Sequence, residues 1–202
     1  MTSTGINTSS ILVFGNVLMG LLEREKPEYL VVVFDTPEPT FRHKAYADYK
    51  AGRDAMPDDL AVAIPRIHDL VDALQIATLQ APGWEADDLA ATLAHQAEAE
   101  GIDTYLVTSY KDYEQLVTDR TRVCRPGGSG EQYQVLGVEE VLEKWQIERV
   151  EQVVDILALM GDKVDNVPGI SGIGEKTAQK RSNHWHGREL ARLHRGAQGQ
   201  AE

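Results

Sequence analysis

The chain has 202 residues, of which 42% are hydrophobic and 26% are charged, and its formal net charge is −12. This composition is typical of a globular protein with a buried core and excludes a disordered chain. A single cysteine, Cys124, excludes a disulfide framework and a thiolate metal site within the chain, so a reducing, cytoplasmic setting is expected. No apolar run approaches the roughly 20 residues that span a bilayer, and no membrane association is expected.

The negative charge is unevenly distributed, which bears on the kind of partner. A net negative charge argues against a general nucleic-acid coat. However, basic side chains gather in two places, between residues 40 and 53 and near the end of the chain, and local basic patches can hold a polyanion. The first patch contains Arg42, His43, Lys44, Lys50 and Arg53, and the second contains Lys176, Lys180, Arg181, Arg188, Arg192 and Arg195.

The first half of the chain begins with apolar residues at helical spacing, which predict a helix over about 8–26. The β-branched run 29–35 predicts a strand buried on both faces of a parallel sheet. Residues 36–57 contain three prolines, many charges and little periodicity, so we expect a functional loop or a mobile segment. A helix over 57–74 and a short strand over 76–79 follow.

The second half continues the alternation of helices and strands. We expect a helix from the acidic stretch near residue 85 to Gly101, a strand over 102–108, and a hairpin turn marked by Gly127, Gly128 and Gly130. Two further helices, from Val138 and from Glu151, lead to a glycine-rich turn and a last helix. Such alternation predicts an α/β fold with a doubly wound, mostly parallel sheet.

The stretch G-W-E-A-D-D-L-A-A, residues 83–91, crowds Glu85, Asp87 and Asp88 at the start of a predicted helix. One interpretation is helix capping, which needs one or two acids. The other is a divalent cation, because hard ions such as Mg²⁺ bind clustered oxygen ligands. Sites in open α/β sheets form at the carboxyl ends of strands. Because Asp35 ends one predicted strand and Asp112 closely follows another, the expected convergence of these acids favours the metal interpretation.

The second informative stretch is G-I-S-G-I-G-E-K, residues 169–176. Gly169, Gly172 and Gly174 would let the backbone turn tightly and uncover N–H groups, while Lys176 and a helix N-terminus add positive charge. That combination can hold a phosphate, and its spacing is that of a helix-hairpin-helix. Alternatively, the glycines merely end one helix and begin another.

Just before this turn, Asp162 and Asp165 lie three residues apart, on one face of a turn. They could complete a second metal position close to the first. Two-metal phosphodiester cleavage requires such a pair, in which one ion readies the water and the other stabilises the leaving oxygen.

These segments, in this order, resemble the 5′-nuclease domain at the N-terminus of bacterial DNA polymerase I, and flap endonucleases generally. The similar segments are V-V-F-D-T-P-E-P-T-F-R, Y-K-A-G-R, M-P-D-D-L, G-W-E-A-D-D-L-A-A-T-L-A, T-S-Y-K-D-Y-E-Q-L-V and I-L-A-L-M-G-D-K-V-D-N-V-P-G-I-S-G-I-G-E-K-T-A. They cover about residues 2–179. The resemblance implies a PIN-like nuclease domain over 1–137, with residues 36–57 as an arch, a helical DNA-binding subdomain over 138–182 and a polar tail over 183–202.

The resemblance also implies roles for single residues. Two divalent ions, Mg²⁺ or Mn²⁺, would be held by a first set of acids (Asp35, Glu85, Asp87 and Asp112, with Asp88 beside them) and by a second set (Asp162 and Asp165). In the arch, Lys50 would polarise the scissile phosphate, Arg53 and Arg42 would steer it, and Tyr49 would stack on a base. Lys111 is counted with the DNA-contacting residues. Gly169, Gly172, Gly174 and Lys176 would grip the duplex, where the family often also binds K⁺.

Two departures from the family pattern keep alternatives open. The family opens with a strand that ends in a central aspartate, and this sequence starts after that point. The family motif Gly-Asp-Lys-Asp here reads Ser-Tyr-Lys-Asp, so Tyr110 replaces a ligand. The first hypothesis is an active 5′→3′ exonuclease and flap endonuclease, with flapped, nicked or forked DNA as substrate and a polymerase domain in the same or another chain as partner.

The second hypothesis is a catalytically impaired or dead remnant that still binds DNA. A third, a PIN-type ribonuclease, is disfavoured by the duplex-gripping turn. His184 and His186 could suggest a further metal, but a frayed polar tail is the expected interpretation of the sequence after residue 183.

Overall fold

The computed structural model describes residues 7–127 and 133–184, which form two compact units. The first unit comprises Met1–Phe41, Asp54–Thr92 and Pro126–Gln134, and the second comprises Arg42–Arg53, Leu93–Arg125 and Val135–Glu202. Each unit is described by itself. The glycines Gly128 and Gly130 and the tail histidine His186 lie outside the described residues.

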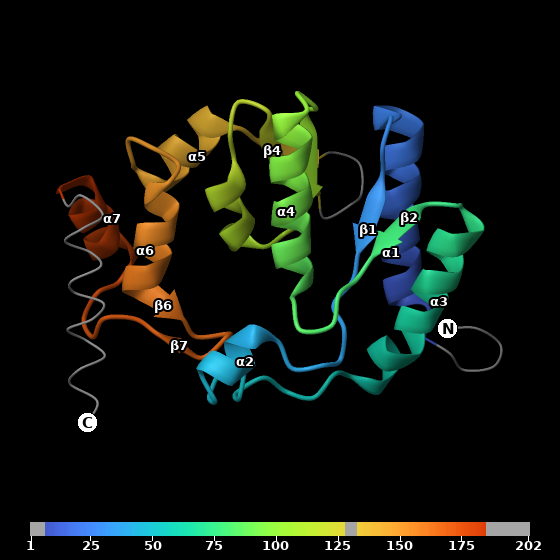
Figure 1. Ribbon diagram of the computed structural model, residues 1–202, viewed down its shortest axis with the longest axis horizontal. Helices are drawn as coiled ribbons and strands as arrows, with labels where there is room; N and C mark the ends of the chain where they lie inside the picture. The colour runs from blue at the N-terminus through green and yellow to red at the C-terminus, as the bar shows by residue number, and fades with distance from the viewer. Residues whose placement is uncertain (1–6, 128–132, 185–202) are drawn as a thin grey trace. The chain divides into compact units, whose positions relative to one another are not determined.

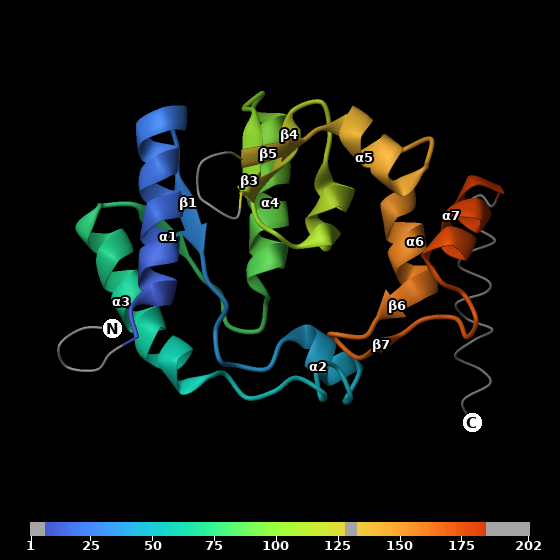
Figure 2. The same ribbon diagram turned by 180° about the vertical axis from the view of Figure 1, so that it is seen from behind.

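The first unit packs two helices beside a pair of parallel strands (Figures 1 and 2). Helix α1 (Ser9–Gly20) continues into a π-helical turn, η1 (Leu21–Glu25), and packs against α3 (Asp58–Ala73). Strand β1 (Val31–Val33) pairs in parallel with β2 (Ala77–Leu79), with Val32 opposite Thr78. The predicted helices and strands of this region are therefore confirmed. Strand β1 is not buried on both faces, however, because Val31 is exposed.

The core of this unit follows from the spacing of its apolar residues. Ile67 and Val71 lie one turn apart on α3 and meet Leu18 of α1, and all three are buried. Partly buried side chains from both helices and from the strand region surround them, namely Ile11, Phe14, Leu30, Val32, Phe34, Leu74 and Ile76. This packing holds α1, α3 and the β1 region together in one core.

Residues 36–57, predicted as a loop or mobile segment, contain a short helix, α2 (Phe41–Ala45). The backbone N–H of Phe41, the first residue of α2, donates to Gly83 O at 3.0 Å. The residues before this helix are irregular, with a bend at residues 37 and 38, and the prolines at 37 and 39 cannot donate backbone hydrogen bonds there.

The second unit contains a three-stranded sheet in the order β3-β4-β5 (Figure 2). Strand β3 (Thr104–Val107) pairs in parallel with β4 (Thr121–Pro126), with Leu106 opposite Val123, and β5 (Tyr133–Leu136) completes the sheet. A 3-10 helix, η2 (Lys111–Leu116), connects β3 to β4. Helix α4 (Ala86–Ala99) begins in the first unit and ends in the second, and α5 (Val138–Trp145) follows the sheet.

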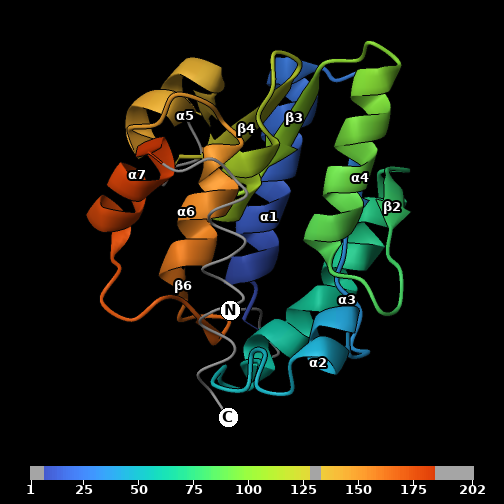
Figure 3. The ribbon, with the colours of Figure 1, turned by 60° about the vertical axis from the view of Figure 1, so that its left-hand side comes forward.

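The rest of the second unit is a helix pair joined by a glycine-rich connection. Helices α6 (Gln152–Met160) and α7 (Glu175–His184) pack side by side (Figure 3). Between them β6 (Gly161–Asp162) and β7 (Val167–Pro168) form a short antiparallel hairpin. Near the start of α6, Gln152 Nε2 donates to Ser182 O at 2.9 Å and to Ser182 Oγ at 3.1 Å, which ties the helices together at one end.

The other end of the helix pair depends on two glycines that approach each other closely. Gly161 has φ +67°, and a Cβ there would lie 2.2 Å from Gly169 N. A Cβ on Gly169 would lie 2.2 Å from Met160 C and O. Since no side chain fits at either position, this close approach of the backbone requires glycine at both residues.

No helix among residues 7–127 and 133–184 combines the length and the apolar character needed to cross a membrane.

Candidate functional site

In the first unit, the end of β1 meets the start of α4, as the sequence predicts for Asp35. Asp35 Oδ1 accepts a hydrogen bond from Ala86 N at 2.7 Å, and Asp88 Oδ2 accepts one from Glu85 N at 3.1 Å. Both are capping bonds at the positive end of a helix. Capping therefore accounts for Asp35 and Asp88. A cap needs no further acids, so it does not explain Asp87 or Glu85, which is buried.

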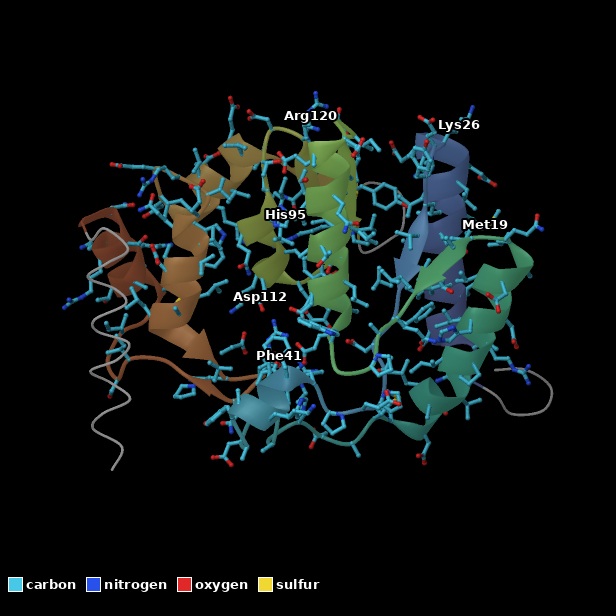
Figure 4. All side chains as sticks on the ribbon, viewed as in Figure 1. Met19, Lys26, Phe41, His95, Asp112 and Arg120 are labelled. Atoms are coloured by element: carbon cyan, nitrogen blue, oxygen red, sulfur yellow. The ribbon has the colours of Figure 1, made fainter. Side chains whose placement is uncertain are left out.

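In the second unit, Asp112 lies on η2, directly after β3 and its following turn (Figure 4). Its Oδ1 atom is buried and has no hydrogen-bond partner among the residues that the structure describes. Burial raises the pKa of the Asp112 carboxyl; the Lys111 ammonium partly offsets this, and the charges of Asp162 and Asp165 raise it further. Asp112 is thus an under-compensated acid in the electrostatic field of two others.

Asp162 and Asp165 are brought together by the turn that links β6 to β7. Asp162 Oδ1 accepts hydrogen bonds from Val164 N at 2.7 Å and from Asp165 N at 3.2 Å, an arrangement that closes the turn. Lys111 Nζ lies 3.6 Å from Asp162 Oδ2. The predicted second acid pair therefore exists as a local structure, next to a lysine from the same helix as Asp112.

Asp165 also holds the segment that the sequence predicts to be the arch. Tyr49 Oη donates to Asp165 Oδ2 at 3.2 Å, Arg53 forms an ion pair with Asp165 Oδ1, and Lys50 Nζ lies 4.0 Å from Asp165 Oδ2. The two segments are also joined through their backbones, because Lys50 N donates a hydrogen bond to Asp165 O at 2.9 Å. We call Tyr49, Lys50, Arg53 and Asp165 the Asp165 cluster.

Within this cluster, burial lowers the pKa of Arg53, but its hydrogen bond and ion pair with Asp165 raise it more, so that the net shift is upward. Tyr49 is only 7% exposed and its ring packs edge-on against His43, with centroids 5.1 Å apart. A base could stack on Tyr49 only after this side chain moved. Of the predicted arch residues, Lys50 and Arg53 are therefore close to Asp165 of the second acid pair, while the predicted stacking residue Tyr49 is covered.

Within residues 7–127 and 133–184, no three acidic, histidine or cysteine side chains converge in a group that could hold a metal ion. Tyr110, which the family resemblance predicts to stand at a ligand position, is 69% exposed. The metal-ligand roles of Asp35, Glu85, Asp87, Asp88, Asp112, Asp162 and Asp165 accordingly stay predictions.

The glycine turn leads directly into α7, as predicted. Gly172 has φ +78°, which favours glycine, and Gly174 O accepts hydrogen bonds from Thr177 N at 3.0 Å and Ala178 N at 2.9 Å as the helix begins. Lys176 lies in the first turn of α7. Glycine is needed at position 169 for packing, since the backbone of Met160 leaves no room for a side chain there. Contact of this turn with phosphate stays a prediction, as does the role of Arg42.

Sequence reasoning missed Glu114, two residues after Asp112 on the same 3-10 helix. Glu114 is fully buried and accepts hydrogen bonds from Lys144 Nζ at 2.7 and 2.8 Å and from Trp145 Nε1 at 2.6 Å, and it pairs with Arg125. Its three partners come from β4 and α5. A buried acid of this kind has no local sequence signal, because its partners are distant in the chain.

Parallel strand pairs with acids at their carboxyl ends and flanking helices define the class, an α/β domain with a PIN-like nuclease fold. The structure is similar to the T5 D15 protein co-crystallised with metal ions, with a TM-score of 0.71 and 22% identity over 86% of this chain and 67% of that chain. A model of the 5′-3′ exonuclease N-terminal resolvase-like domain matches residues 1–146, and one of the 5′-3′ exonuclease C-terminal SAM fold matches residues 148–193. The chain belongs to the 5′-3′ exonuclease family, which confirms the predicted fold and the family resemblance.

Two relatives illustrate the range of this family. The 5′-3′ exonuclease of Aquifex aeolicus is 44% identical over 177 residues, 88% of this chain and 60% of the relative. The thermostable DNA polymerase I of Thermus thermophilus is 42% identical over 184 residues, 91% of this chain and 21% of the relative. The chain thus spans about a fifth of that polymerase and less than two thirds of that exonuclease.

Proposed function

We propose that the chain is a structure-specific 5′→3′ exonuclease and flap endonuclease that hydrolyses DNA with divalent metal ions. The observation that carries the proposal is the Asp112 carboxylate, whose buried Oδ1 atom lacks a hydrogen-bond partner among the described residues and whose pKa is raised by burial. In a member of the 5′-3′ exonuclease family, a buried carboxylate that lacks a hydrogen-bond partner and lies in the field of two other carboxylates is a good candidate for a cation ligand.

The donor set fits hard divalent ions such as Mg²⁺ or Mn²⁺, because it consists of carboxylate oxygens. Asp35, Glu85, Asp87 and Asp112, with Asp88 beside them, would hold one ion, and Asp162 and Asp165 would hold a second. Bound ions would supply an activated water and charge stabilisation for the leaving oxygen. A cation would also relieve the repulsion between Asp112, Asp162 and Asp165, which raises the pKa of Asp112 in its absence.

The basic residues of this chain have separate tasks in the proposal. Lys50 and Arg53 would release Asp165 and bind the scissile phosphate, with Arg42 steering the strand. Lys111 would neutralise a neighbouring phosphate. Gly172, Gly174 and Lys176, at the start of α7, would grip the duplex through backbone N–H groups and one positive charge, with Gly169 maintaining the turn. Carbonyl oxygens of this turn would bind K⁺.

The natural substrate would be duplex DNA with a 5′ flap, nick or fork. Because the polymerase relatives continue far beyond the matched region, we also propose that a polymerase domain, in the same or another chain, works on the same DNA.

A second candidate is a DNA-binding remnant with impaired catalysis. It is favoured by the exposed Tyr110 at a ligand position and by the engagement of Asp165 with Lys50 and Arg53, which a metal ion would have to displace.

One experiment separates these candidates. A 5′-flap DNA duplex, with an RNA flap of the same sequence as comparison, is incubated with the wild type and with Asp87→Asn in Mg²⁺ or Mn²⁺, while calorimetry follows Mn²⁺ uptake. We expect DNA cleavage and Mn²⁺ binding by the wild type, both weakened in Asp87→Asn. Salt-sensitive DNA binding without cleavage supports the remnant. Equal cleavage by both proteins contradicts the metal site.

A further inference from the structure

We propose that Phe41 and Trp84 form a stacking platform for a nucleobase in the single-stranded part of the DNA. This inference rests on the proposed function and deepens it, since it names a substrate contact to which none of the roles described above assigns a residue. Both residues belong to the first unit, in which Phe41 opens α2 (Figure 4) and Trp84 lies just before α4.

The two rings form a pair that remains open to solvent. Their centroids are 5.2 Å apart at an interplanar angle of 55°, a tilted arrangement typical of favourable aromatic pairs. Even so, Phe41 is 43% exposed and Trp84 is 51% exposed. Exposing two large aromatic side chains together forgoes hydrophobic stabilisation, which suggests that this surface is kept for a ligand.

The backbone holds the pair in place. Phe41 N donates to Gly83 O at 3.0 Å and Trp84 N donates to Ala81 O at 3.2 Å, so the turn 81–84 anchors both residues. Gly83 has φ +87°, which favours glycine and fixes the turn. A platform ordered in this way loses little conformational entropy when a ring stacks on it.

The position of the platform points to a nucleobase as its occupant. Trp84 directly precedes Glu85 in the chain, and Ala86 N, two residues after Trp84, donates to Asp35 Oδ1 at 2.7 Å, so the backbone that carries Trp84 leads directly into the acidic start of α4. Phe41 is followed in α2 by Arg42, His43 and Lys44, which suit a phosphate backbone. Aromatic faces flanked by basic residues are the usual means by which proteins hold single-stranded nucleic acid without reading its sequence.

The platform also answers a difficulty with Tyr49, the stacking residue that the family resemblance implies. Tyr49 is covered and bound to Asp165, whereas Phe41 and Trp84 already present ring surface. A protein partner is the competing occupant, and the experiment below distinguishes it, since a protein interface would not respond to bases in the DNA.

The test compares two 5′-flap duplexes that differ only in their flaps, one with natural nucleotides and one with abasic residues of the same length. Binding of the full chain is measured by fluorescence anisotropy in EDTA, which prevents metal-dependent cleavage. The variants are Trp84→Ala, Trp84→Phe and Phe41→Leu. Tyr29→Ala is the matched control, because Tyr29 is an aromatic residue of the same unit that is even more exposed than Phe41 and Trp84. Thermal unfolding checks that each variant is folded.

We expect the wild type to bind the base-bearing flap about tenfold more tightly than the abasic flap, in line with the usual contribution of a stacked base. Trp84→Ala and Phe41→Leu should lose most of this preference, Trp84→Phe should retain most of it, and Tyr29→Ala should leave it unchanged. Binding of both duplexes with no preference, or equal weakening on both by Trp84→Ala, overturns the platform alone. If the wild type bound neither duplex, the proposed function would fail together with the platform.

Discussion

Asp112 and Glu114 lie two residues apart on the same 3-10 helix, yet their surroundings are opposite. Glu114 is fully buried, and basic side chains and an indole N–H satisfy both of its oxygens. Asp112 is half-buried, has an oxygen without a hydrogen-bond partner among the described residues, and has a pKa that is raised by burial and by the charges of Asp162 and Asp165. Full compensation fits a structural acid, whereas the uncompensated oxygen of Asp112 is the feature on which its proposed role as a cation ligand rests.

The sharpest way to break this comparison is to neutralise Asp112. We expect Asp112→Asn to lower metal-dependent flap cleavage about a thousandfold, the equivalent of about 4 kcal/mol in the barrier, since in the proposed function it removes a charged ligand of the metal ion. Its free energy of unfolding should not fall. Single-turnover cleavage in Mg²⁺ and urea unfolding measure the two effects. A variant that cleaved normally would remove Asp112 from the site.

Glu114 should respond in the reverse manner. Glu114→Gln leaves Lys144 and Arg125 without their shared counter-charge, so we expect the free energy of unfolding to fall by about 3 kcal/mol, the lower end of the range for broken buried ion pairs because both cations reach solvent. Any loss of cleavage should disappear once the fraction of folded protein is taken into account. A stable variant with lost cleavage would instead make Glu114 functional.

The pH dependence of stability tests whether the charge of Asp112 destabilises the fold. Because the pKa of Asp112 is raised in the folded state, its charge destabilises the fold above that pKa, and the penalty disappears as the pH falls and the carboxyl is protonated. In EDTA at pH 7 we therefore expect Asp112→Asn to be more stable than the wild type by less than about 1 kcal/mol. The difference should shrink towards acidic pH, as urea unfolding between pH 4 and pH 7 would show. A constant difference contradicts this explanation.

The smallest effect is expected at an exposed ion pair, which tests whether burial is what gives Glu114 its importance. Arg66 Nη1 lies 3.2 Å from Asp69 Oδ2 on the surface of α3, one turn away along the helix. Arg66→Ala should change the free energy of unfolding by less than about 0.5 kcal/mol in the same urea experiment. A loss comparable to that of Glu114→Gln would mean that charge pairing alone, and not burial, explains the difference.

Local patterns sufficed to predict most elements of this fold. The spacing of Ile67 and Val71 predicts the buried face of α3, and the β-branched run before Asp35 predicts β1. The meeting of Asp35 with the start of α4 was also predictable, because parallel strands bring their carboxyl ends to one edge. What could not be predicted depends on residues distant in sequence. Glu114 requires partners about 10 to 30 residues away, and the engagement of Tyr49 by Asp165 spans 116 positions.

The close approach of Gly161 and Gly169 has a consequence for the connection between α6 and α7. At this point the backbone after β7 meets the end of α6 without an intervening side chain, and Ile170 N donates to Leu159 O at 2.9 Å. The segment that leads into the glycine turn is therefore held against the end of α6, while Gln152 and Ser182 hold the end of α7 against the start of the same helix. Any displacement of the glycine turn away from α6 must break the contacts at this point.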